Sequence, residues 1–255
     1  MAVLEVIGAD GGKHSGSSLV CMRLGPSVLV DAGSGSSLHD SELAGLEVVL
    51  VTHAHLDHIA ELGFIVDASV SFRDRPIRVA ASHACIEAIR THYMNDLIWP
   101  DFSRIQTSSG LTVVYEELVD FQWLDLPGGI RAMPIPVNHG AGGRGFIFRS
   151  ATGSIVYTGD TGPTIAIWEE AARLDDLRLV VAEVSFPDSE KDVAIASDHL
   201  TPELLLDDLS RLGSSRVPVY AFHLKPWHRQ EIDRDLSRSF SDRAVLLMKG
   251  DRLSF

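Results

Sequence analysis

Hydrophobic runs in the first third of the chain are short and are separated by turn residues, a pattern typical of β-strands. We predict strands at residues 2–7, 18–24, 27–30, 48–52 and 77–81. The first three are separated by Gly11-Gly12 and Gly25-Pro26, so they are expected to form an antiparallel sheet. The apolar spacing then becomes helical over residues 84–97, and Trp99-Pro100 is expected to end that helix.

The second half of the chain alternates strands with helices. Strands are predicted at residues 130–137, 145–148, 154–158, 179–183, 217–222 and 244–248, and helices at 164–174, 202–212 and 229–240. The helix at 202–212 is clearly marked, because Thr201 can act as its N-cap and Pro202 fits its first position. This order favours an α/β architecture in which two mixed sheets pack face to face with helices outside. The order divides near residue 125 without a linker, so one domain over residues 1–255 is expected.

Composition and charge restrict the class of partner. The 255 residues are 45% hydrophobic, enough to bury a large core, and the net charge of −13 argues against binding to a long nucleic acid. The N-terminal segment contains Glu5 and lacks the pattern of a signal peptide, which favours a cytoplasmic protein without membrane association. Cys21 and Cys85 are expected to be buried thiols rather than a disulfide. A homodimer is compatible with the sequence, which does not determine the oligomeric state.

Four side chains able to bind a metal follow the apolar run 48–51 within six positions: His53, His55, Asp57 and His58. Side chains two apart in an extended segment point the same way, so His53 and His55 can hold one ion. Asp57 and His58, at the following bend, can face a second ion. Imidazole nitrogen and carboxylate oxygen are ligands that zinc accepts. The cluster therefore predicts a metal centre at the end of a strand.

Three further polar residues follow predicted strands, namely His139, Asp160 and His223. Open α/β sheets usually present their sites at the carboxyl ends of strands. Each residue alone could be a helix cap or a hydrogen-bonded turn residue. Their order after the first cluster makes them candidate ligands.

With these residues, the chain resembles the metallo-β-lactamase superfamily, whose five motifs are matched along nearly its whole length. The resemblance implies an αββα sandwich holding two divalent ions, with zinc expected and manganese or iron also compatible. It implies a first site of His53, His55 and His139, a second site of Asp57, His58 and His223, and Asp160 bridging both ions. The presence of His58 and the lack of a cysteine near Asp160 disfavour β-lactam hydrolysis. Lactonases and thioester hydrolases share the seven ligands.

Two more stretches resemble the Glu and His-x-Thr elements of phosphodiesterase branches: Glu183-Val184-Ser185-Phe186-Pro187 and Asp198-His199-Leu200-Thr201-Pro202. In those branches the His, oriented by the Glu, faces the leaving-group oxygen. Segments 53–59, 95–102 and 223–226 resemble the class II cyclic-nucleotide phosphodiesterases. Glu61 departs from the Gly or Ser expected there in that family.

The resemblance implies hydrolysis of a 3′,5′-cyclic nucleotide, cyclic AMP or cyclic GMP, to a 5′-nucleotide by a hydroxide shared between the two ions. His199 would be the general acid, with Glu183 orienting it. Asp57 has an alternative role as a general base. Asp31 and Thr52 are expected to support the ligands, although strand-end hydrogen bonding explains them almost as well.

Aromatic residues and nearby loops offer weaker signals. Tyr93, Trp99 and Phe102 could stack on a nucleobase, with core packing expected for at least one of them. His14, beside Gly11-Gly12, lies in a loop that could border the site, and a phosphate contact by Lys225 is no better supported than a solvated lysine.

Three alternatives remain. A nuclease resembling the tRNA 3′-processing endonuclease (tRNase Z) would share the Glu and His elements, but the sequence lacks the Gly- and Lys-rich arm that such enzymes use to hold RNA. A lactonase or thioesterase would use the same ligands and leave Glu183 and His199 unexplained. A binding protein without turnover is the least favoured, because none of the seven ligands is missing.

Overall fold

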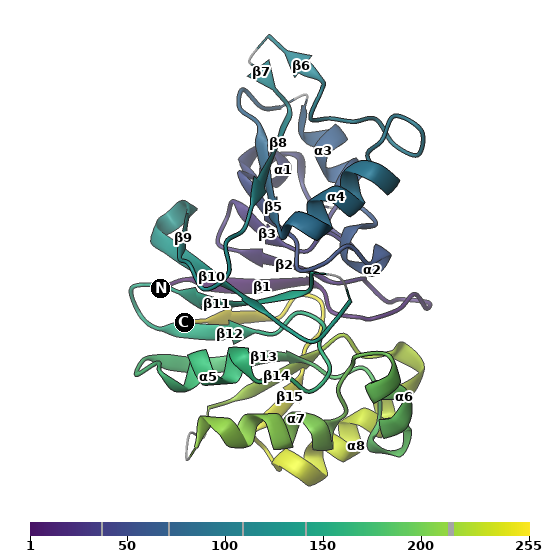
Figure 1. Ribbon diagram of the computed structural model, residues 1–255, viewed down its shortest axis with the longest axis vertical. Coiled ribbons are helices and arrows are strands. Elements are labelled where there is room, and N and C mark those ends of the chain that lie inside the picture. Colours follow the sequence, from purple (N-terminus) through teal and green to yellow (C-terminus); the bar gives the residue numbers. More distant parts are fainter. Residues whose placement is uncertain (37, 71, 109, 141, 214–216) are drawn as a thin grey trace.

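The computed structural model describes residues 1–36, 38–70, 72–108, 110–140, 142–213 and 217–255. In this part of the chain, two seven-stranded sheets pack together and helices cover their outer faces (Figure 1). The predicted αββα sandwich is therefore confirmed. A small hairpin of β6 (Gln106–Thr107) and β7 (Gly110–Leu111) projects from the first half. Across the described residues, helices long and apolar enough to cross a bilayer are absent.

The first sheet has the strand order β16-β1-β2-β3-β4-β5-β8. Its strands are β1 (Val3–Gly8), β2 (Cys21–Leu24), β3 (Val28–Val30), β4 (Val48–Leu50), β5 (Ile77–Ala81), β8 (Val113–Glu117) and β16 (Arg252–Ser254). Its helices are α1 (Asp40–Gly45), α2 (Leu56–Ile59), α3 (Leu62–Val70) and α4 (His83–His92). Strands β1 to β3 pair antiparallel, as predicted, whereas β3, β4, β5 and β8 pair parallel.

The second sheet has the order β15-β14-β13-β12-β11-β10-β9 and begins where the sequence divides near residue 125. Its strands are β9 (Leu124–Leu126), β10 (Ile130–Pro136), β11 (Arg144–Arg149), β12 (Ser154–Tyr157), β13 (Leu177–Glu183), β14 (Val219–Phe222) and β15 (Ala244–Leu246). Its helices are α5 (Ala166–Ala172), α6 (Lys191–Ala196), α7 (Pro202–Leu209) and α8 (Arg229–Phe240).

Strand β12 shows how the layers are held together. Ile155 and Tyr157 point into the core between the sheets, while Val156 packs under the helices of the second half. Alternate side chains of a strand face opposite sides, so a strand buried on both sides is apolar throughout. Burying each large apolar side chain stabilises the fold by about 1.5–3 kcal/mol. Both cysteines are buried free thiols in the first half.

Several predicted element boundaries were wrong, including those of α4 and β2. Helix α4 ends at His92 rather than at residue 97, because the Asn95 side chain accepts hydrogen bonds from the backbone of Leu97 and Ile98, and Asp96 adopts a φ of 63°. Strand β2 begins at Cys21, not at residue 18. The boundaries of α8 and the Thr201 cap of α7 are as predicted.

The strand directions place the chemistry at one edge of the second sheet. Strands β10 and β12 each run antiparallel to β11, so they point the same way, and β13 and β14 are parallel to β12. Their carboxyl ends lead directly to His139, Asp160, Glu183 and His223. In the first sheet, the parallel strands β3 and β4 lead to Asp31 and His53.

Candidate metal centre

The loop between β4 and α2 brings three histidines together. His53 follows the buried strand, and His55 is the N-cap residue of α2, with an extended backbone. His58 lies within the single turn of α2 and folds back toward His53. The ring centroid of His53 lies 4.5 Å from that of His55 and 4.2 Å from that of His58. Such crowding of imidazoles is unfavourable if all are protonated, and it suits shared metal binding.

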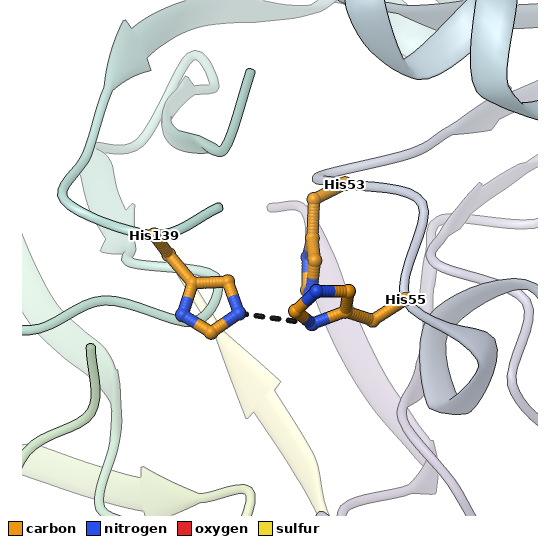
Figure 2. A group of neighbouring side chains, drawn as sticks. All are labelled: His53, His55 and His139. Carbon is orange, nitrogen blue, oxygen red and sulfur yellow. Dashed lines mark hydrogen bonds between the residues drawn. The ribbon is translucent and has the colours of Figure 1, made fainter. Parts of the chain in front are cut away.

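His139 arrives from the end of β10 and completes the first predicted set of ligands. Figure 2 shows His139 facing His53 and His55, and its Nε2 lies 3.1 Å from Nδ1 of His55. The Nδ1–H group of His139 donates to the carbonyl of Asp198 at 2.8 Å. That bond leaves Nε2 with its lone pair toward the cluster, because only one ring nitrogen of a neutral histidine carries a proton.

The Asp160 carboxylate lies at the middle of the cluster. Its Oδ2 is 3.0 Å from Nε2 of His223 and 3.2 Å from Nε2 of His58. The same oxygen is 3.8 Å from Nε2 of His53 and 3.9 Å from Nε2 of His139. Two of these histidines belong to each predicted site, which is the arrangement a bridging ligand requires. Asp57 completes the second set, with Oδ2 lying 3.2 Å from His223 Nε2.

Three buried atoms of this group have no well-oriented hydrogen bond among the described residues: Nε2 of His53, Nε2 of His58 and Oδ1 of Asp160. Nε2 of His58 lies 3.2 Å from the other oxygen of Asp160, but that contact is not a well-oriented hydrogen bond. An unsatisfied buried polar atom costs about 1–3 kcal/mol, so three in one cluster need an explanation. Imidazole nitrogens and carboxylate oxygens suit a borderline divalent cation. The residues present therefore fit a metal centre.

The electrostatics of the cluster agree with this assignment. Burial would lower the pKa of His58, but the carboxylates of Asp160 and Asp31 outweigh burial and hold that pKa well above its ordinary value. Burial would raise the pKa of Asp160, but His223 and His58 hold it well below its usual range. The pKa of His53 is lowered, first by burial and then by His58. The site thus balances a buried carboxylate with positive charge, which divalent cations would supply in place of protons.

Asp31 and Thr52 lie behind the histidines, where supporting groups were predicted. Asp31 Oδ2 accepts a hydrogen bond from His58 Nδ1 at 2.8 Å, so His58 turns Nε2 toward Asp160. The Thr52 hydroxyl donates to the Asp31 carboxylate at 2.9 Å and lies 3.0 Å from His53 Nδ1. A hydroxyl that donates to Asp31 accepts from His53, which frees Nε2 of His53 as a ligand atom.

Glu183 and His199 form a buried dyad beside the ligands. Glu183 Oε1 accepts from His199 Nδ1 at 2.8 Å and from the backbone N–H groups of Thr161 and Leu200 at 3.2 Å each. His199 Nε2 is therefore left free for chemistry. The His199 ring centroid lies 4.8 Å from that of His139, inside the ligand cluster.

Sequence reasoning missed two residues of the site. The hydroxyl oxygen of Ser185 lies 2.8 Å from Nδ1 of His223, and nothing distinguishes this serine in the sequence. Gly11 packs so closely that a Cβ atom there would lie 2.4 Å from the His223 carbonyl oxygen and 2.6 Å from its ring. The Gly11-Gly12 pair was the available signal, since glycine permits close backbone approach.

Three of the six non-glycine residues with a positive φ in the described part of the chain lie at this candidate metal centre. Asp31, Asp198 and His223 have φ values of 61°, 53° and 64°, in the left-handed region that non-glycine residues seldom adopt. Each such residue costs about 1–3 kcal/mol and persists only where the surroundings hold it. Asp31 and Asp198 hydrogen-bond to the predicted ligands His58 and His139, and His223 is itself a predicted ligand. The strained backbone therefore lowers stability at the positions that orient the ligands.

The aromatic residues proposed for stacking have separate structural roles. Phe102 is buried in the core under the helices of the first half, which confirms the core packing expected for at least one of the three. The Tyr93 hydroxyl accepts from the backbone of Gly63 and donates to that of Ala60. Trp99 lies edge-on to Phe64, with ring centroids 4.7 Å apart.

Other residues singled out from the sequence have ordinary contacts. His14 is exposed, and its loop reaches the site through Gly11 and through Ala9, whose carbonyl accepts from the His223 N–H group at 2.7 Å. The Lys225 ammonium donates to the Gly11 carbonyl at 2.6 Å. Glu61, which departs from the resembled family, accepts hydrogen bonds from the backbone of Gly35 and Ser36 and ties down the loop after β3.

Known proteins are similar to this chain in sequence and in fold. The family described as "Beta-lactamase superfamily domain" matches residues 27–223, a range that contains all seven predicted ligands. A 3′,5′-cyclic-nucleotide phosphodiesterase of Schizosaccharomyces pombe is 24% identical over 246 residues, covering 84% of this chain and 68% of that protein. Ribonuclease Z of Mycobacterium bovis is 32% identical over 181 residues, covering 61% of this chain and 63% of that protein. Among solved structures, unliganded yeast PDE1 has a TM-score of 0.83 at 19% identity, covering 100% of this chain and 99% of that one.

Proposed function

This chain belongs to the beta-lactamase superfamily, and within it we propose that it is a metal-dependent phosphodiesterase hydrolysing 3′,5′-cyclic nucleotides to 5′-nucleotides. The observation that carries the proposal is the Glu183–His199 dyad beside the seven predicted ligands. The resemblance to a cyclic-nucleotide phosphodiesterase supports the same substrate class. We propose that the protein acts in the cytoplasm on this small-molecule substrate.

Each residue of the centre then has a task. The ligands are His53, His55 and His139 for one ion, Asp57, His58 and His223 for the other, and Asp160 between them. When bound, two divalent ions would lower the pKa of a water molecule toward neutrality and neutralise negative charge on the phosphoryl group. Zinc is the first candidate for both positions, with manganese and iron next.

The leaving group of a cyclic nucleotide is the ribose 3′-oxygen, which needs a proton as its bond to phosphorus breaks. His199 would supply that proton from Nε2, because Nδ1 is engaged by Glu183 at 2.8 Å. Glu183 also accepts from two backbone N–H groups, so its carboxylate is held rigidly and fixes the histidine ring. A thiolate leaves without needing a proton, so a thioester hydrolase would have no use for a general acid such as His199. The presence of the Glu183–His199 dyad therefore favours a phosphodiester substrate over a thioester.

A second candidate substrate is a phosphodiester of RNA, which would use the same chemistry. The similarity to ribonuclease Z, and to endoribonuclease ysh-1 of Neurospora crassa at 27% identity over 250 residues, favours it. The net charge of −13 opposes it, because RNA backbones are bound mainly by clustered Lys and Arg.

The first experiment compares substrates on protein of known metal content. Cyclic AMP, cyclic GMP, a short RNA, a lactone and a thioester are assayed with and without a chelator. We expect turnover of a cyclic nucleotide that the chelator abolishes. Preference for RNA would select the second candidate, and preference for the lactone or thioester would refute the phosphodiesterase proposal.

The role of His199 is tested by changing the leaving group. His199→Ala should reduce turnover of a cyclic nucleotide by about 10² to 10⁴, the usual contribution of a general acid. The loss should be much smaller for bis(4-nitrophenyl) phosphate, because nitrophenolate leaves without a proton. The matched control is His83→Ala, since His83 is exposed and its Nδ1 pairs with Glu117 at 3.2 Å, away from the predicted ligands. Equal losses on both substrates would show that His199 is not the proton donor.

A further inference from the structure

The structure contains a hydrogen-bonded connection between the predicted second metal site and the His199 dyad. We propose that Ser185 is the positioning residue that makes this connection: it holds His223 as a ligand and completes the support of Glu183. The part of the inference that concerns Glu183 and His199 rests on the proposed function. The part that concerns His223 rests only on the metal centre.

The contacts of Ser185 involve both partners. Its Oγ lies 2.8 Å from Nδ1 of His223 and 3.1 Å from Oε2 of Glu183. It also lies 3.2 Å from Nδ1 of His199, and all four side chains are buried. The same Oγ lies 3.2 Å from the His223 carbonyl oxygen. Because the group is buried, water is poorly placed to replace the serine hydroxyl.

The hydrogen bonds of Ser185 have a definite direction, because its hydroxyl carries one proton to donate and lone pairs to accept. Glu183 Oε2 at 3.1 Å and the His223 carbonyl at 3.2 Å can only accept, so the Ser185 hydroxyl donates its one proton toward them and its lone pairs are left to accept. Nδ1–H of His223 then donates to Ser185, which leaves Nε2 of His223 as the atom facing Asp160 and Asp57 at 3.0 and 3.2 Å. His199 donates from Nδ1 to the other oxygen of Glu183. The result is one chain running from His223 through Ser185 and Glu183 to His199.

Loss of the hydroxyl should act on the metal centre first. His223 would keep a buried Nδ1–H without an acceptor, at a residue whose φ of 64° is already unfavourable. The ring could relieve this by rotating, and Nε2 would then leave Asp160. Groups that orient metal ligands typically contribute 10- to 100-fold in metal affinity. We expect a loss of that size, confined to the ion held by Asp57, His58 and His223.

The test measures metal retention, without any substrate. Wild type, Ser185→Ala and Ser185→Thr are loaded with zinc, and ions per chain are counted as a chelator is added. Ser185→Ala should release one of two ions at a roughly 10- to 100-fold lower chelator concentration. Ser185→Thr keeps the hydroxyl and should behave like wild type. The control is Ser69→Ala, which removes another buried serine hydroxyl, bonded to the Ile65 carbonyl at 2.6 Å in α3.

Two outcomes would overturn the proposal: release of both ions by Ser185→Ala at the wild-type chelator concentration, or equal losses in Ser185→Ala and Ser185→Thr. If Ser185→Ala does not fold, Ser185→Cys carries the same expectation, because a thiol is a much weaker hydrogen-bonding group. A wild-type protein inactive on every phosphodiester would refute the proposed function and leave this measurement valid.

Discussion

The two halves of the candidate metal centre are built in different ways. The first sheet contributes His53, His55, Asp57 and His58 from a single loop and one helical turn. The second sheet contributes one residue from the end of each of several strands, including Asp160 and His223. A local turn fixes the first set, whereas sheet register fixes the second. A slip of one residue in β12 or β14 would turn its side chains to the other face and remove a ligand.

The largest effect should come from Asp160, the residue on which the halves meet. Asp160→Asn removes the negative charge that lies within 3.9 Å of four imidazole nitrogens. We expect loss of both ions and of activity, beyond the about 10- to 100-fold that supporting groups contribute. Metal analysis after dialysis measures this.

The matched control is Asp208→Asn, another buried carboxylate, whose Oδ2 accepts from Thr164 and Trp168. Burial raises the pKa of Asp208, so a neutral amide is tolerated there. If Asp160→Asn retains both ions, the Asp160 carboxylate is not the ligand shared by the two halves of the metal centre.

An intermediate effect is expected from Asp31, which supports the first half. Asp31→Asn keeps a residue that tolerates the φ of 61°, but an amide N–H₂ group cannot accept a hydrogen bond, so either His58 or Thr52 loses its acceptor oxygen. Metal affinity should fall about 10- to 100-fold. Isothermal titration calorimetry with zinc measures the metal affinity, and a thermal unfolding curve of the same variant shows whether the protein is folded. Together they separate weaker metal binding from misfolding. Unchanged affinity would show that the loop orients His58 without Asp31.

A smaller effect is expected from Gly11, where the N-terminal segment touches the second half. Gly11→Ala would place a Cβ 2.6 Å from the His223 ring, so the ring or the loop must shift. We expect a several-fold weaker hold on one ion, measured by chelator competition. Gly12→Ala is the control, because its Cβ would meet Pro226 and Trp227 only at ordinary contact distances of 3.4 and 3.5 Å. Equal behaviour of the two variants would remove Gly11 from the site.

Local patterns allowed much of the fold to be predicted, and tertiary packing explains the errors. Helix α8 was predicted with its observed bounds because its apolar residues are confined to one face. Helix α3 was missed because Leu62, Ile65 and Val66 are buried while Phe64 is exposed, so its apolar residues do not follow one face. The role of Phe102 stayed open between stacking and core packing, because an aromatic residue in a loop looks the same in sequence whether it enters the core or faces a ligand.

By itself, the sequence determined the αββα class and the dense cluster from His53 to His58, because strand alternation and turn spacing act over a few residues. Positions at strand ends made His139, Asp160 and His223 candidates, and the resemblance divided the seven residues between two ion sites. Only the tertiary structure decided that one oxygen of Asp160 lies among four imidazole nitrogens, and that Ser185 links His223 to Glu183. Those contacts depend on how parallel strands align at a sheet edge, and serine carries no distinctive sequence signal, so no local pattern encodes them.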